Sequence, residues 1–416
     1  MKTTALALGL VASAATFPAS AGEGPIPRGV PHLDHVFLIM MENHGFSQVI
    51  NNPNDPFVNK YATKANLGTN YFAVAHPSLT NYLEVVGGSN FGVQTDNFPD
   101  WHSTTCTTNL ASGITATDNP ASPLICPIAG TGTDAETPAY DFTNETQGPP
   151  GTINIDGVQS IPAASNTVGK TIADQLDAHH RSWKSYQEDL PIVGADGVNI
   201  SDGFYTNNTD FSAITPILNP ALDPSQIVYL YAVKHNPFAY FKSVQDGHDP
   251  DSSLRNVVPF GGPNGLFADL GAGKAPTFSF IVPNQCNDQH GRGNAGPFCN
   301  YDPSDDGSQA GLNPALMYRG DVTVQRLVEA IHASKAWHED NSAIVVIWDE
   351  NDYSLSPNIN QVVVIVDTSY GPHGIQSAHR YNHFSLLKSM EAGFELPCLN
   401  HACDKDVAVM SDLFSR

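Results

Sequence analysis

The sequence has few basic residues: 19 Lys and Arg stand against 42 Asp and Glu, and the formal net charge at pH 7 is −23. A surface of that charge repels nucleic acid and anionic membranes at neutral pH, which argues against a nucleic-acid-binding protein. Long apolar runs are also missing, because no stretch reaches the ~18 apolar residues that a membrane-spanning helix needs. We therefore expect a globular protein without stable membrane insertion.

Cysteine is scarce, and none of the six cysteines has the CxxC spacing of a zinc or redox site. Six cysteines allow ~15 disulfide connectivities, of which pairing between sequence neighbours is the simplest. Those pairs are Cys106 with Cys126, Cys286 with Cys299, and Cys398 with Cys403. Disulfides agree with export to an oxidising compartment.

The N-terminus has the features of a secretory signal. Lys2 supplies positive charge, 6–17 is apolar, and Ala19-Ser20-Ala21 fits a small-residue cleavage site. We expect cleavage after Ala21, one domain over 22–416, and a secreted or periplasmic protein. The part from about 90 to 165 is rich in Thr, Asn, Pro and Gly, which favours a loop-rich insertion that a disulfide staples.

Strands alternate with helices along the rest of the chain, which predicts an α/β fold with a mostly parallel or mixed central sheet. The clearest strands are 36–41 and 342–348, apolar runs with polar residues at their ends, as buried strands have. Further strands are expected at 227–233, 277–282 and 361–366, and an ordered stretch at 73–88. Helices are expected at 167–179, with Thr167 as its cap, at 322–334 and at 381–392.

Both of the clearest strands end in an acidic cluster: Glu42 and Asn43 follow the first, and Asp349 and Glu350 follow the second. Open α/β sheets place their sites at the carboxyl ends of parallel strands, and oxygen ligands of this kind suit a hard divalent cation. The alternative is a pair of exposed acidic loops. Two clusters at one end of one sheet favour a metal site.

Ser78 lies between the two clusters in the sequence, within the segment His-Pro-Ser-Leu-Thr-Asn-Tyr of residues 76–82. A hydroxyl beside a helix start, with backbone N–H groups following it, can face a phosphate. Asn81, one turn later, can hydrogen-bond a phosphate oxygen. From these residues alone, an ordinary helix N-cap is the favoured interpretation of Ser78.

Four of the sixteen histidines stand in polar clusters where a site is expected. They are His235, His290, His373 and His383. Histidine serves as a metal ligand or a general acid, and for each of the four a structural role is equally open. Asp288 and His290 are two residues apart, so their side chains face the same way only where the backbone is extended.

In their order along the chain, these segments resemble the phosphoesterase family, which contains bacterial and fungal acid phosphatases and phosphatidylcholine-type phospholipases C. The matching segments are 35–43, 76–82, 183–189, 234–237, 283–290, 348–350 and 381–387. Members of that family resemble the alkaline phosphatase superfamily in fold. The resemblance implies an alkaline-phosphatase-like sandwich, with the central sheet flanked by helices.

The resemblance also implies roles. A divalent metal (Ca, Mg, Mn or Zn) is expected on Glu42, Asn43, Asp349 and Glu350, with Asp288 at the place of a second metal or its replacement. Ser78 is expected as the nucleophile that forms a phosphoserine, and Asn81, His290 and His235 as substrate-binding residues. His373 and His383 are expected as late ligands or as the acid to the leaving group.

Three functions follow as hypotheses. The first is a secreted acid phosphatase of small phosphate monoesters, phosphoinositides among them. The second is a phospholipase C or another phosphodiesterase with the same site, and the third is a non-catalytic, calcium-stabilised binding protein. Position 82 favours the first, because Tyr82 stands where phospholipase C relatives usually carry Arg. Glu350, where several relatives have Asp, leaves the identity and number of metals open.

Overall fold

The computed structural model describes residues 23–93, 96, 99, 127–129, 167–190, 230–245, 252–292, 296–304, 307–351 and 360–416. The expected cleavage site, the pair Cys106 and Cys126, and most of the expected insertion lie outside these residues. The other two expected disulfides are confirmed: Cys286 bonds Cys299, and Cys398 bonds Cys403. Among the described helices, none is long and apolar enough to span a membrane.

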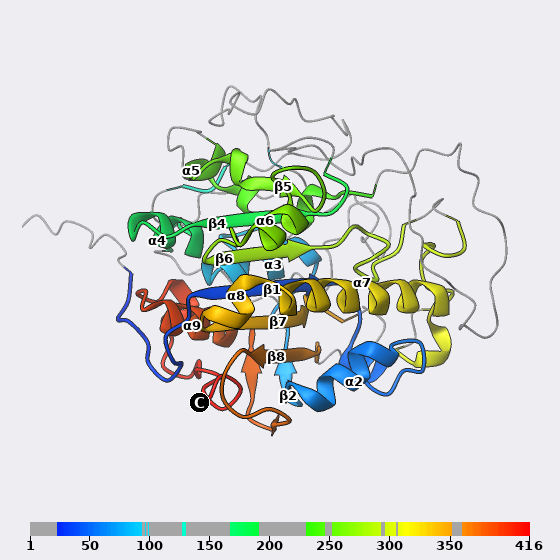
Figure 1. Cartoon of the computed structure of the whole chain (residues 1–416). Helices are drawn as coiled ribbons and strands as arrows, with labels where there is room; N and C mark the ends of the chain where they lie inside the picture. Colours follow the sequence, from blue (N-terminus) through cyan, green and yellow to red (C-terminus); the bar gives the residue numbers. More distant parts are fainter. Residues whose placement is uncertain are drawn as a thin grey trace, which may run out of the picture.

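A central sheet of eight described strands runs through the molecule in the order β5-β4-β6-β1-β7-β8-β2-β9 (Figure 1). The strands are β1 His35–Met41, β2 Asn66–Gly68, β4 Trp183–Gln187, β5 Val257–Pro259, β6 Phe278–Val282, β7 Ser342–Trp348, β8 Val364–Thr368 and β9 Gln376–Ser377. From β5 to β7 all neighbours are parallel, whereas β8 runs antiparallel to both β7 and β2. The expected α/β fold with a mostly parallel sheet is confirmed.

Helices cover both faces of this sheet. They are α1 Phe46–Val49, α2 Pro56–Lys64, α3 Ser78–Gly87, α4 Ile172–Ala178, α5 Lys242–Gln245, α6 Leu266–Ala272, α7 Pro314–His332, α8 Lys335–Glu339 and α9 His383–Phe394. In Figure 1, α7 and α8 cross in front of the strands and α3 lies behind them. On the first face α7 packs against α2, α6 and α8, and on the other α3 packs against α4 and α9.

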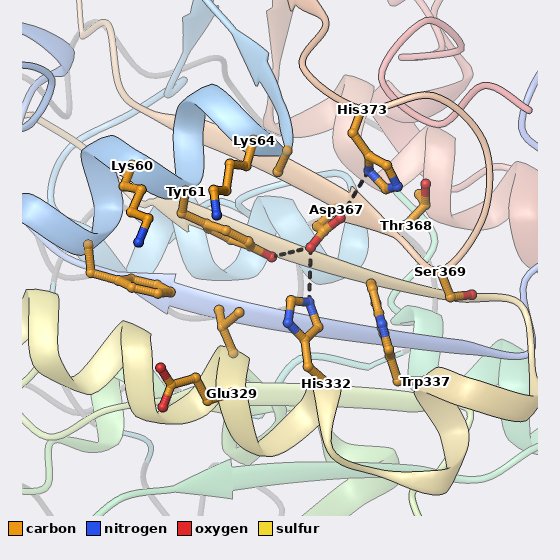
Figure 2. Close-up of a pocket in the computed structure, with 13 residues that line it drawn as sticks. Lys60, Tyr61, Lys64, Glu329, His332, Trp337, Asp367, Thr368, Ser369 and His373 are labelled. Carbon is orange, nitrogen blue, oxygen red and sulfur yellow. Dashed lines mark hydrogen bonds and ion pairs between the residues drawn. The ribbon is translucent and has the colours of Figure 1, made fainter.

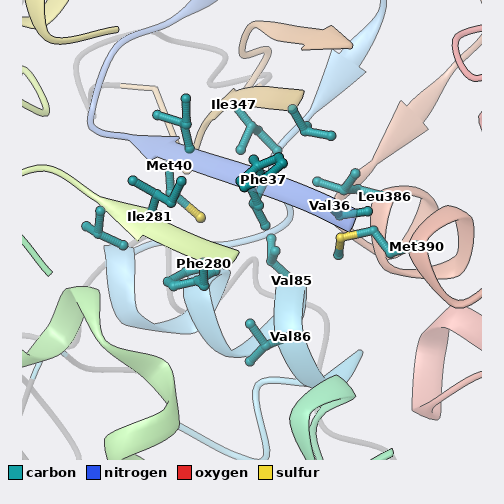
Figure 3. Packing of buried hydrophobic residues seen from close by; sticks show 14 of the residues in the cluster. Val36, Phe37, Met40, Val85, Val86, Phe280, Ile281, Ile347, Leu386 and Met390 are labelled. Carbon is teal, nitrogen blue, oxygen red and sulfur yellow. The ribbon is translucent and has the colours of Figure 1, made fainter. Parts of the chain in front are cut away.

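The centre of the core is β1, which is apolar along its length because it is covered on both faces. Val36, Phe37 and Met40 pack among side chains of β6, β7, α3 and α9 (Figure 3). β1 pairs with β7 in register from His35 beside Ser342 to Met41 beside Trp348. Both strands therefore end at the same edge of the sheet, and the polar residues after them are brought together.

Three expected elements differ from the structure. Helix α4 begins after Thr171, whose Oγ1 accepts the Ala173 N–H at 3.2 Å, so Thr167 is not its cap. The described part of the expected strand 227–233 is not a strand, because Val233–His235 forms a 3-10 turn ahead of Pro237. Helix α7 begins earlier than expected, at Pro314, since Asn313 caps it and proline suits the first helical position.

Gly88, which ends α3, gives a test of this packing. Its φ is +71°, and a Cβ there would lie 2.4 Å from the Leu399 carbonyl oxygen. We expect Gly88→Ala to lower the free energy of unfolding by roughly 1–3 kcal/mol, since both the left-handed backbone and the contact with main chain are unfavourable. Urea unfolding measures it. Gly261→Ala is the control, because nothing lies within 4 Å of its Cβ position, and an equal loss in both variants would contradict the explanation.

Candidate active site

The ends of β1 and β7 are joined by main-chain and side-chain hydrogen bonds. The Asp349 N–H donates to the Met41 carbonyl at 3.0 Å. Asp349 Oδ1 accepts the N–H groups of Asn43 at 3.0 Å and of Glu350 at 2.7 Å. Asn43 takes a left-handed backbone conformation with φ +59°, which turns the chain away directly after the strand. The two acidic clusters of the sequence therefore form one site.

Ser78 is the first residue of α3, and Pro77 is the N-cap. The Ser78 hydroxyl donates to Glu350 Oε1 at 3.3 Å and is fully buried. It caps no N–H group of the helix, so the N-cap interpretation favoured from the sequence is wrong. The Leu79 N–H, expected to be available to a ligand, instead donates to Asp96 Oδ1 at 3.0 Å. What the helix start offers to the site is the Ser78 side chain.

Asn81 supports Glu350. Its Nδ2 donates to Glu350 Oε2 at 3.0 Å and to the Ala75 carbonyl at 2.9 Å, so both of its N–H groups have partners inside the protein. His76 Nδ1 lies 2.9 Å from the same Oε2. The carboxylate of Glu350 is therefore held on one oxygen by Asn81 and His76 and presents the other to Ser78. A phosphate contact of Asn81 stays a prediction.

His235 joins the first acidic cluster to a third strand end. Its Nε2 lies 2.8 Å from Glu42 Oε1, and its Nδ1 lies 3.3 Å from Asp288 Oδ2. Tyr82 stacks on its ring with centroids 5.1 Å apart. Burial lowers the pKa of His235, but the charge of Glu42 and the hydrogen bonds that the ring donates to Asp288 and Glu42 outweigh it, so the pKa is raised overall.

Four carboxylates, those of Glu42, Asp288, Asp349 and Glu350, are fully buried around this point. Burial, followed by the charges of Glu42 and Glu350, raises the pKa of Asp349 well above its usual range. Burial also raises the pKa of Glu42, but the charges of His290, His235 and Lys234 outweigh it and lower that pKa to about 2. The site thus crowds carboxyl groups together, at a cost that falls most heavily on the ionised form of Asp349.

Some oxygens of the expected metal ligands have no hydrogen-bond partner among the described residues. They are Glu42 Oε2, Asn43 Oδ1 and Asp349 Oδ2, all buried. Buried oxygens without donors are costly unless a cation faces them, so this donor set fits a hard divalent cation. In the described parts of the chain, no group of three or more His, Cys, Asp or Glu side chains is arranged so that it could hold a metal ion as it stands.

Lys234 and Asp96 were not singled out from the sequence. Lys234 Nζ lies 3.1 Å from Asp96 Oδ2 and 3.3 Å from His290 Nε2, and it is buried. His290 is held in turn, since its N–H donates to Asp288 Oδ1 at 2.8 Å and its Nδ1 faces the Gly291 carbonyl at 2.7 Å. The position of Lys234, directly before His235 in a strongly acidic chain, was the one hint in the sequence that this lysine belongs to the site. Its partner could not be inferred, because Asp96 is 138 residues away.

His383 is at the site but has a structural contact on each ring nitrogen. Its Nε2 donates to the Asp349 carbonyl at 2.6 Å, and its Nδ1 faces the Tyr71 hydroxyl at 3.0 Å. Burial lowers its pKa to about 4. His383 therefore positions the end of β7, and nothing in this arrangement directs it to a leaving group.

His373 is not at the site, which corrects its expected catalytic role. Its Nδ1 lies 3.3 Å from Asp367 Oδ1. Asp367 stands beside Ile344, near the start of β7, because β8 is antiparallel. The polar cluster around His373 does follow a strand, as expected, but β8 is antiparallel and ends at the opposite edge of the sheet.

Comparison with known proteins supports the resemblance to the phosphoesterase family. A sequence model of the Phosphoesterase family matches residues 50–297. A phosphate-repressible acid phosphatase of Penicillium chrysogenum is 24% identical over 88% of this chain and 60% of its own length. A phosphatidylinositol-3-phosphatase of Mycobacterium tuberculosis is 22% identical over 90% of this chain and 81% of its own. The chain spans little more than half the length of the fungal acid phosphatases it matches.

Among solved structures, one from Vibrio parahaemolyticus, described as a protein in the alkaline phosphatase superfamily, aligns with 94% of this chain and 74% of its own. Its sequence identity is 12% and the TM-score is 0.46.

Asp349→Asn tests the crowding of buried carboxyl groups. Asparagine keeps an oxygen for the N–H groups of Asn43 and Glu350 while removing one charge beside Glu42. We expect the variant to gain roughly 1–2 kcal/mol in free energy of unfolding when a chelator is present, since replacing a repelled buried charge is stabilising. Thermal and urea unfolding measure it, with the exposed Asp406→Asn as control. A loss of stability in chelator would show that the carboxylate is already balanced.

Proposed function

Because the chain belongs to the Phosphoesterase family, we propose that it hydrolyses small phosphate monoesters with Ser78 as the nucleophile. The observation that carries the proposal is the hydrogen bond from Ser78 Oγ to Glu350 Oε1, at 3.3 Å, beside the joined ends of β1 and β7. Relatives named acid phosphatase and phosphatidylinositol-3-phosphatase support monoesters as the substrate class.

Glu350 is placed to act as the base. The Ser78 proton already lies on the bond to Glu350 Oε1, so attack of Oγ on phosphorus transfers it along that bond. Asn81 and His76 hold the other oxygen of Glu350, at 3.0 Å and 2.9 Å, which fixes the direction of the acceptor. The step forms the Oγ–P bond and breaks the P–O bond to the leaving group, which departs as an alcohol or phenol after taking a proton from water. The product is a phosphoserine, which water then hydrolyses to inorganic phosphate and free Ser78.

A divalent cation fits the donor set of Glu42, Asn43 and Asp349, with Glu350 next to them. The support is their buried oxygens without hydrogen-bond partners among the described residues. When bound, such a cation stabilises the negative charge on the phosphoryl oxygens. Oxygen donors of this kind suit Mg, Mn or Ca. Its charge also offsets the repulsion that an anionic substrate meets in a chain of net charge −23.

Lys234 is the cationic group of this part of the site, and its ammonium donates to His290 Nε2 at 3.3 Å. Both are buried and lie next to the carboxylates, so we propose that they bind the phosphoryl oxygens, with His235 behind them. Tyr82, at the position where phospholipase C relatives usually carry Arg, is stacked on His235 and brings no cation for a second ester group. That placement supports a monoesterase over a phosphodiesterase with the same site.

The two confirmed disulfides support an extracytoplasmic location. We propose that the protein works outside the cytoplasm.

The decisive assay compares p-nitrophenyl phosphate with the choline diester of p-nitrophenyl phosphate. We expect turnover of the monoester, lost by a factor on the order of 10³ or more in Ser78→Ala, because the nucleophile is removed. We expect chelation to remove it too, and added divalent cation to restore it. The matched control is Ser411→Ala at an exposed serine, which should keep full activity.

Each other outcome decides against part of the proposal. Turnover of the diester alone would identify a phosphodiesterase. Monoester turnover that survives Ser78→Ala would remove Ser78 as nucleophile. A folded protein whose melting temperature depends on the cation but which turns over neither substrate would be a binding protein.

A further inference from the structure

A cavity of about 550 Å³ lies on the other edge of the sheet from Ser78, between α2, the end of α7, α8 and the end of β8 (Figure 2). Asp367, at its base, stands beside Ile344 near the start of β7, whereas Asp349 follows the end of that strand. Ile344 and Asp349 are five residues apart along the strand direction, which corresponds to about 16 Å. Cavities of about 300–1,000 Å³ are the size that holds small organic ligands. This cavity is therefore a separate candidate binding site.

Asp367 organises the base of the cavity. It is buried and accepts hydrogen bonds from the Tyr61 hydroxyl and from His332 Nε2, both at 3.0 Å, while His373 Nδ1 lies 3.3 Å from its other oxygen (Figure 2). Both carboxylate oxygens are engaged, so the two imidazole rings are held in fixed directions. The second nitrogens, His332 Nδ1 and His373 Nε2, have no hydrogen-bond partner among the described residues, and both histidines line the cavity.

The walls of the cavity are aromatic. Phe57 and Tyr61 are stacked, with centroids 5.6 Å apart and planes 20° apart. Across from them, Trp337 packs against His332 with centroids 4.5 Å apart. Trp337 and Phe57 are only partly buried, so their ring surfaces are open to a guest. A flat ring can lie against such walls by offset or edge contacts.

Two lysines give the entrance its charge. Lys60 and Lys64 are one helical turn apart on α2, exposed, and both line the cavity (Figure 2). Neither forms an ion pair with any residue that the structure describes. Glu329 on α7 is the acidic group opposite them. In a chain with 42 acidic residues and 19 basic ones, two lysines side by side at one opening provide local positive charge.

We propose that this cavity binds a small aromatic anion, such as an aryl carboxylate, sulfonate or phosphate. The ring lies between Phe57, Tyr61 and Trp337, and the anionic group reaches the ammonium groups of Lys60 and Lys64. A metal cation is a poorer fit, because the histidine nitrogens nearest Asp367 are used as donors to it. An organic cation would meet the two lysines. The proposal is independent of the chemistry at Ser78.

Calorimetric titration of the full chain with 2-naphthalenesulfonate tests the proposal, since the probe holds a ring and a charge but no hydrolysable phosphate. At low ionic strength we expect saturable binding at one site. The double variant Lys60→Gln/Lys64→Gln should bind at least about tenfold more weakly, because both charges that face the anion are removed. Both positions are exposed on a helix, so the variant should fold.

The control double variant is Lys274→Gln/Lys405→Gln, which removes the same charge at two exposed lysines elsewhere and should bind as the wild type does. Uncharged 2-naphthol should bind more weakly than the sulfonate. Three results would overturn the proposal: no saturable binding to the wild type, equal weakening in both double variants, or equal affinity for the neutral and the charged probe.

Discussion

The repulsion among four buried carboxylates at the ends of β1 and β7 is the constraint on which the rest of the structure depends. Glu42, Asp288, Asp349 and Glu350 are all fully buried. Taking one carboxylate out of water is costly, and each neighbour of like charge adds to that cost. The fold meets it with His235 between Glu42 and Asp288, with Lys234 nearby, and with oxygens left over for a cation.

The pairing of β1 with β7 in the central sheet brings these carboxylates together. β1 and β7 are parallel and end at neighbouring residues, Met41 and Trp348, so the chain must turn away at the same place twice. Apolar packing on both faces of β1 gives those strand ends a rigid base. Helix α3 begins at Ser78 near the same edge of the sheet, and the Ser78 hydroxyl donates to Glu350. The proposed nucleophile and the buried carboxyl groups are therefore placed together by one edge of the sheet.

The parts that the sequence predicted well are those with a local physical signal. The runs 36–41 and 342–348 are apolar because they are buried on both faces. The acidic residues that follow them stand out because they interrupt this apolar pattern. The role of Ser78 as a cap was wrong because Ser78 is the first residue inside the helix and Pro77 occupies the N-cap position. His373 was misplaced because strand direction, which decides the edge, is set by pairing and not by composition.

Other parts could not be found from the sequence. The partnership of Lys234 with Asp96 joins residues 138 apart, and the cavity around Asp367 is assembled from α2, α7 and β8. Neither the ion pair nor the cavity produces a periodic or compositional pattern in the sequence. Asn81 was expected at a phosphate, yet both of its N–H groups support Glu350 and the Ala75 carbonyl. Such assignments depend on which donors remain available, and only the folded chain determines that.

The central claim is that the carboxylate cluster holds a divalent cation that Ser78 needs. Elemental analysis of the metal in purified, catalytically active protein, set against Glu42→Gln, tests it most directly. The account predicts at least one divalent cation per active chain and its loss from the Glu42→Gln protein. A fully active preparation that contains no stoichiometric metal would contradict it.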